Sequence, residues 1–285
     1  MCIRDRLSTI EEGIALYEHE WLHGISSSFE LRGRHISSNR YVPMILPDGR
    51  SLHGINDASI RIGLRLSKDE TIVRMPFEVR HMGSKYPIFS FDFTGAKRGV
   101  LPASYDYLRL EGRMQYRLNL PPVGYSRLML EGGKIFGKVP YLLLKLHEGN
   151  GTYFYDRYAF SCMNFYEFSS DAWISFFYEH HFNGFLLGRV PLLKKLNWRE
   201  VFVFKGVYGT LSARNDGSLP NTKAVMLFPV GMSSVEHPYL ETGFGIENIF
   251  RLLRVDFIWR LTHHRPIPGL SIPTFTVNFS LNLKF

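Results

Sequence analysis

The chain ends in Phe275-Thr-Val-Asn-Phe-Ser-Leu-Asn-Leu-Lys-Phe285, a run in which apolar and polar residues alternate without a break. Side chains alternate between the two faces of a β-strand, so one face of this segment carries only apolar side chains. These are Phe275, Val277, Phe279, Leu281, Leu283 and Phe285. Soluble proteins seldom leave such a strand at a terminus, because an apolar edge strand promotes aggregation. Transmembrane strands of about 9–11 residues have this pattern. The segment therefore predicts a membrane β-barrel.

The same alternation recurs upstream, most clearly in Ser59–Leu66, Pro87–Thr94, Tyr107–Leu118 and Arg254–Leu261. We expect strands at 25–35, 57–67, 86–94, 105–118, 125–136, 154–167, 171–183, 199–213, 236–245, 253–263 and 273–285. Bacterial single-chain barrels have an even number of strands, so either Ala15–Leu22 supplies another or further strands precede this sequence. The prediction is an all-β, antiparallel transmembrane barrel with about 11–12 strands present, forming the C-terminal part of a larger barrel. A large soluble β-sandwich also alternates and is the main competing fold.

Composition excludes a helical membrane protein and argues against a nucleic-acid-binding protein. Aromatic residues make up 15% of the 285 residues and mean hydropathy is −0.09. No stretch approaches the roughly 18 apolar residues of a membrane helix. The net charge of +8 is spread along the chain and interleaved with carboxylates. We therefore expect no nucleic-acid partner.

The first six residues, Met-Cys-Ile-Arg-Asp-Arg, match the translation of a transposon-end adapter used in sequencing libraries. We expect residues 1–6 to be a cloning or assembly scar, with the barrel domain occupying 7–285 and the native chain extending upstream. The nucleotide sequence of these codons tests this. The two cysteines, Cys2 and Cys162, provide neither a disulfide framework nor metal-ligand spacing.

The polar faces of the predicted strands carry charges of both signs. In a barrel these side chains converge in the lumen, where we expect them to form ion pairs that fill it or, alternatively, to line a polar pathway. The predicted lumen residues are Arg61, Arg65, Asp92, Arg109, Glu111, Arg113, Arg117, Glu131, Glu179, Lys205, Glu241, Asp256 and Arg260.

Counting back from a periplasmic C-terminus places 214–236 and 263–272 outside the cell. It places 184–198 and 246–253 at periplasmic turns. Both turns are apolar and basic, which predicts short amphipathic helices at the membrane surface.

His19-Glu20-Trp-Leu-His23 matches the H-E-x-x-H pattern. On a helix the two histidines share a face and can bind zinc, with the glutamate as general base. No third ligand is evident nearby, and the segment also fits a strand. We expect no metal or other cofactor. Stoichiometric zinc that is lost on His19→Ala substitution would contradict this expectation.

Several ordered motifs resemble one family. They are Phe160–Phe168, Ser170–Trp173, Glu179–Gly184, Val190–Leu196 and Gly245–Asp256. They resemble the Bacteroidota outer-membrane family of unknown function whose full-length members carry an N-terminal carboxypeptidase-regulatory-like domain. The resemblance covers most of residues 20–285 and implies an outer-membrane barrel without catalytic residues. Arg254-Val-Asp256 and Phe285 are also similar to the surface-antigen and barrel-assembly superfamily.

The ending is similar to the C-terminal strand of Gram-negative outer-membrane barrels, in which the final aromatic forms part of the assembly signal. The resemblance implies that outer-membrane lipid and the barrel-assembly machinery are partners. We expect a cell outer-membrane protein with a structural, transport or assembly role, not an enzyme. A soluble β-rich binding protein and a zinc hydrolase using His19 and His23 are the alternatives.

Overall fold

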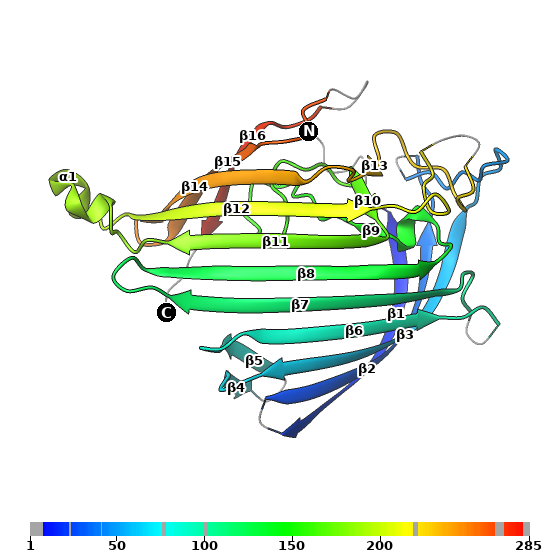
Figure 1. The fold of residues 1–285 in the computed structure, drawn as a ribbon, viewed down its shortest axis with the longest axis horizontal. Helices are drawn as coiled ribbons and strands as arrows, with labels where there is room; N and C mark the ends of the chain where they lie inside the picture. Colours follow the sequence, from blue (N-terminus) through cyan, green and yellow to red (C-terminus); the bar gives the residue numbers. More distant parts are fainter. Residues whose placement is uncertain are drawn as a thin grey trace.

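The alternating segments form one large antiparallel sheet in the computed structural model, which describes residues 8–22, 24–40, 42–75, 78–99, 102–218, 222–265 and 271–281. The sheet is strongly curved, and its eleven strands follow one another in chain order (Figure 1). They are β1 (Thr9–Leu22), β2 (Ile25–Ser37), β3 (Gly54–Ser67), β6 (Ile88–Ala96), β7 (Tyr107–Asn119), β8 (Tyr125–Gly137), β11 (Ala172–His181), β12 (Arg199–Thr210), β14 (Tyr239–Ile249), β15 (Leu253–Arg260) and β16 (Phe275–Leu281).

The two faces of the sheet differ in chemistry. In β6 the side chains of Phe89, Phe91 and Phe93 are 38%, 39% and 48% exposed and point to one face, which we call the outer face. Asp92 points to the opposite, inner face. Cross-strand register preserves this division, because Phe91 lies opposite Leu64 and Arg113 lies opposite Glu131. The period-two pattern therefore sorts side chains by face over the whole sheet.

The predicted all-β, antiparallel fold is confirmed, with eleven strands in one curved sheet of the described residues, in which β1 and β16 form the two edges and do not pair with each other. β1 supplies the additional strand predicted at 15–22 and is longer than expected. The described strands β1, β2, β3, β7 and β8 have 13 or 14 residues each, which exceeds the soluble mode of about 5–6.

The strand predicted at 154–167 is wrong. β8 pairs directly with β11 over ten residues, so the sheet has no free edge between them for another strand. Residues 138–171, which we call the inner segment, instead cross the inner face. The segment contains η2 (Tyr141–Leu143), β9 (Lys145–Leu146) and β10 (Phe168–Ser170). β10 also pairs with β13 (Ser233–Ser234).

The connections between strands agree with only one of the two predicted amphipathic helices. Residues 184–198 contain η3 (Leu187–Arg189) and α1 (Pro191–Lys194). Residues 246–253 comprise the end of β14, a tight turn at 250–252 and the start of β15, so the helix predicted there is wrong. Asn248, Phe250 and Arg251 take positive φ angles of 70°, 49° and 67°, which an α-helix cannot contain. No helix in the described part of the chain has the length and apolarity needed to cross a membrane.

Two apolar clusters fix the connecting segments against the inner face. One contains Tyr141–Leu144, with Ile55 of β3 and Trp173 of β11. The other contains Phe160 and Met163 of the inner segment. These two side chains are 1% and 2% exposed. Side-chain packing and short stretches of backbone pairing, such as β10 with β13, therefore hold the inner segment. A separate hairpin, β4 (Thr71–Met75) and β5 (Glu78–Gly83), follows β3.

Candidate functional site: an ion-pair network on the inner face

The alternation of each strand places the thirteen predicted lumen residues on the inner face. They are Arg61 and Arg65 of β3, Asp92 of β6, Arg109, Glu111, Arg113 and Arg117 of β7, Glu131 of β8, Glu179 of β11, Lys205 of β12, Glu241 of β14, and Asp256 and Arg260 of β15. The inner segment binds the strands of the C-terminal half of the sheet, from β8 to β16. The sequence did not reveal that this segment supplies many of the partners.

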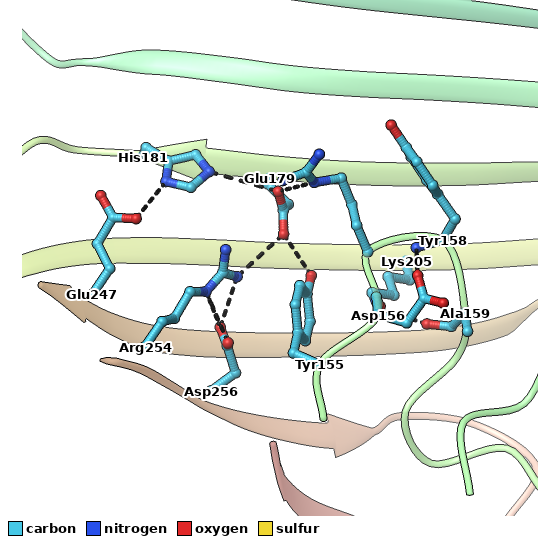
Figure 2. Close-up of polar contacts among 11 residues, drawn as sticks. Tyr155, Asp156, Tyr158, Ala159, Glu179, His181, Lys205, Glu247, Arg254 and Asp256 are labelled. Atoms are coloured by element: carbon cyan, nitrogen blue, oxygen red, sulfur yellow. Dashed lines mark hydrogen bonds and ion pairs between the residues drawn. The ribbon is translucent and has the colours of Figure 1, made fainter. Parts of the chain in front are cut away.

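Glu179 lies at the centre of the network (Figure 2). Its Oε1 accepts a hydrogen bond from the Tyr155 hydroxyl at 2.6 Å and from Arg254 Nη2 at 3.1 Å. Its Oε2 accepts one from Arg157 Nε at 2.6 Å. The residue is only 1% exposed. A buried carboxylate of this kind is tolerated because charged and hydroxyl donors surround both oxygens.

Arg254 links Glu179 to a second carboxylate. Its Nε donates to Asp256 Oδ2 at 2.8 Å and its Nη2 donates to Asp256 Oδ1 at 2.8 Å. His181 lies on the other side of Glu179, with its Nδ1 3.1 Å from Glu247 Oε2. Tyr125 stacks on His181 at a centroid distance of 4.5 Å. The network thus joins β11, β14, β15 and the inner segment.

Lys205 and Glu241 lie directly opposite each other on β12 and β14, but each also binds the backbone of the inner segment. Lys205 Nζ donates to the carbonyls of Asp156 and Ala159 at 2.7 and 2.6 Å. Glu241 accepts from the amides of Ser161 and Cys162 at 2.8 and 2.7 Å. These two charges satisfy backbone groups that would otherwise be buried without partners.

Two further ion pairs fix the ends of the inner segment. Arg260 Nη2 donates to Glu167 Oε1 at 2.6 Å. Glu131 accepts from Arg113 of β7 and from Lys145 of the segment, both at 2.7 Å. Arg113 and Glu131 were predicted from the sequence. Lys145 and Glu167 were missed, because only the packed structure brings them to the inner face.

The remaining predicted charges have local partners. Arg61 pairs with Glu30 at 2.9 Å and lies 3.8 Å from Asp92. Arg65 pairs with Glu70, and Arg109 pairs with Glu111 at 2.7 Å. Arg117 differs from these: its guanidinium lies over the Tyr125 ring at 4.3 Å.

The described part of the H-E-x-x-H segment, residues 19–22, is strand and not helix. It lies in β1, where His19 sits between the exposed Tyr17 and Trp21 of the outer face. The neighbouring Glu20 points to the other face. A strand separates residues i and i+4 by about 13 Å, whereas the zinc motif requires the one-turn spacing of a helix. His23 lies outside the described residues, which contain no cluster of three or more metal-ligating side chains.

Four of the six predicted assembly-signal residues lie on the outer face of β16: Phe275, Val277, Phe279 and Leu281. The other two, Leu283 and Phe285, lie outside the described residues, as do residues 1–6. The backbone of Phe279 also bonds to Tyr153 and Tyr155 of the inner segment, at 2.7 Å each.

We expect His147 to make the inner segment sensitive to acid. Its side chain is buried beside Ser170, and burial lowers its pKa to about 3. The neutral imidazole therefore favours the folded state, and this contribution is complete above the unfolded pKa of about 6.5. It is lost as the pH falls towards 3.

At pH 5 the loss amounts to about 2 kcal/mol of unfolding free energy, from the linkage relation. We expect unfolding in detergent to show this drop between pH 7.5 and pH 5. His147→Gln keeps a hydrogen-bonding side chain but does not titrate, so the drop should be smaller by that amount. An identical pH dependence in both proteins would contradict the assignment.

Comparisons with known proteins agree with this architecture. Residues 17–213 match the C-terminal domain of a family of unknown function (DUF5686). No curated protein matches the chain. A solved structure, BamA from Haemophilus ducreyi lacking POTRA domains 1–3, matches with a TM-score of 0.57 and 10% sequence identity. The match covers 96% of this chain and 54% of that one. The chain thus spans about half of the BamA chain, and at this identity the likeness shows the barrel fold alone.

Proposed function

The chain belongs to the family of unknown function (DUF5686) whose C-terminal domain it matches, and from this premise we propose that it is a non-catalytic β-barrel domain of a bacterial outer membrane. The observation that carries the proposal is the contrast between the two faces of the sheet. The outer face exposes an apolar set that includes Phe91, Phe93, Phe244, Trp259 and Phe275. Lipid is the environment in which such a continuous apolar face is stable.

The inner face supports a role other than that of an open pore through which solutes diffuse freely. Ion pairs from β8, β11 and β15 tie the inner segment to the inner face of these strands. A barrel occupied in this way is suited to anchoring attached domains or to assisting assembly at the membrane. Transport through it would require the inner segment to move. The sequence resemblance supports a Bacteroidota source, an N-terminal carboxypeptidase-regulatory-like domain, and the outer-membrane lipid and the barrel-assembly machinery as partners.

The two competing functions would require other features of the molecule. A soluble β-rich binding protein would need a partner to cover the aromatic outer face. A zinc hydrolase would need His19 and His23 to converge, and β1 places His19 between two exposed aromatic side chains.

Fractionation of a Gram-negative cell that exports the chain tests the proposal. We expect the protein in detergent-extracted outer membranes, with faster electrophoretic migration before boiling than after it. A periplasmic marker protein serves as the control for incomplete lysis. Recovery with that marker in the soluble fraction would contradict the proposal.

A further inference from the structure

A cavity of about 810 Å³ lies on the inner face beside the ion-pair network. Its wall includes the ends of β7 and β8 next to their turn, together with part of the inner segment. Lys85, Arg117, Arg127 and Arg157 line it, with Asp69 and Glu179 as the carboxylates. Four cations thus face two anions.

This excess of positive charge is not general on the inner face. A neighbouring cavity of about 270 Å³ is lined by Arg113 and Lys145 and by three carboxylates. A third, of about 460 Å³, is lined by three arginines and three carboxylates. A cavity of about 890 Å³ beside Arg260 carries two cations, Arg260 and Arg265, and two carboxylates, and one of about 760 Å³ among the loops carries three cations and two carboxylates. The cavity of about 810 Å³ therefore has the largest excess of cations among these five in the described residues.

Of the three arginines in this cavity, Arg157 pairs with Glu179, whereas Arg117 and Arg127 form no ion pair with a carboxylate of the described residues. Glu179 is already bound by Arg157 and Arg254. Arg117 and Arg127 lie directly opposite each other on β7 and β8, an arrangement that costs free energy because the like charges repel. In the described part of the chain their close contacts are with the Tyr125 ring, at 4.3 and 5.3 Å.

We propose that this cavity is a binding site for a multivalent oxyanion, a phosphate- or carboxylate-bearing ligand held by Arg117, Arg127 and Arg157. Guanidinium groups bind such oxyanions through paired hydrogen bonds. The volume lies within the range of about 300–1,000 Å³ that is common for ligand sites. Tyr158 and Phe177 also line the cavity and provide an apolar surface for the remainder of the ligand.

The position of the cavity indicates which side supplies the ligand. It lies at the end of the sheet where β7 and β8 are joined by the short turn at 120–124, the same end at which β16 reaches Leu281. In the proposed membrane orientation this end faces the periplasm. That orientation rests on the proposed function, whereas anion binding by the purified protein does not.

Titration calorimetry of the purified chain in detergent tests the site, with inorganic pyrophosphate and triglutamate as probes and trialanine as the neutral control, all at constant ionic strength. We expect saturable binding of at least one anion and none of trialanine. Preference for pyrophosphate identifies a phosphate ligand, and preference for triglutamate identifies an acidic polypeptide. Failure of both anions to bind saturably would overturn the proposal.

Arg127→Gln should weaken binding at least tenfold. It should also raise the unfolding midpoint of the ligand-free protein, because the repulsion from Arg117 is relieved. Arg117→Gln should reproduce both effects from the opposite strand. Arg50→Gln is the matched control, since the Arg50 side chain is 78% exposed in a separate ion pair with Asp48. Equal affinity in the unmodified protein and in both cavity variants would also overturn the proposal.

Discussion

Replacing Glu179 by alanine is expected to lower the unfolding free energy by about 3–5 kcal/mol, the typical cost of removing one partner from a buried ion pair. The side chain accepts hydrogen bonds from Tyr155, Arg157 and Arg254. Its loss leaves two guanidinium groups without this carboxylate, and Arg254 is itself only 2% exposed. The inner segment should detach from β11 more readily as a result.

The measurement is denaturant unfolding of the detergent-solubilised protein, together with limited proteolysis of residues 138–171. Glu148→Ala is the matched control, because it removes a carboxylate from the same segment. The Glu148 side chain is 64% exposed and 3.7 Å from Lys145, so its removal should cost less than about 1 kcal/mol. Equal effects of the two substitutions would show that the network does not hold the segment.

Replacing Phe91 by arginine is expected to destabilise the protein in a bilayer by about 2–4 kcal/mol, as for cations on the lipid face of other barrels. Phe91 lies near the middle of β6 and is 39% exposed on the outer face. In water, an arginine at a partly exposed strand position would be tolerated far better, because the charge would remain hydrated.

Unfolding in phospholipid vesicles measures this effect. Val230→Arg is the control, since Val230 is 81% exposed in the long connection before β14. That position should tolerate the charge with a change within about 0.5 kcal/mol. A Phe91→Arg variant as stable in vesicles as Val230→Arg would indicate that the outer face does not contact lipid.

The strands of the sheet could be predicted from the sequence because apolar and polar residues alternate along a half-buried strand. This alternation is visible within each segment taken alone. Phe89, Phe91 and Phe93 identify β6 and its outer face without reference to any other part of the chain. The charged residues predicted for the inner face occupy the alternate positions of the same strands.

What the sequence could not provide was the path of the inner segment. Tyr155 and Arg157 lie in a stretch whose local pattern resembles a strand, and it is the direct pairing of β8 with β11 that excludes them from the sheet. Their contacts with Glu179 join residues more than twenty positions apart. No local pattern encodes such contacts. The turn at 250–252 was missed for a related reason, because the apolar spacing of 246–253 fits a helix while the positive φ angles of Asn248, Phe250 and Arg251 favour a tight reversal.

The most direct test of the membrane assignment compares two adjacent positions of β6, Ser90 and Phe91, in a chain in which Cys2 and Cys162 have been replaced. Each position receives a single cysteine carrying a nitroxide spin label, and the protein is reconstituted in phospholipid vesicles. We predict that the label at position 91 collides mainly with oxygen dissolved in the lipid and that the label at position 90 does not. Access of a water-soluble nickel chelate to both labels, with no excess of oxygen collisions at position 91, would contradict the assignment.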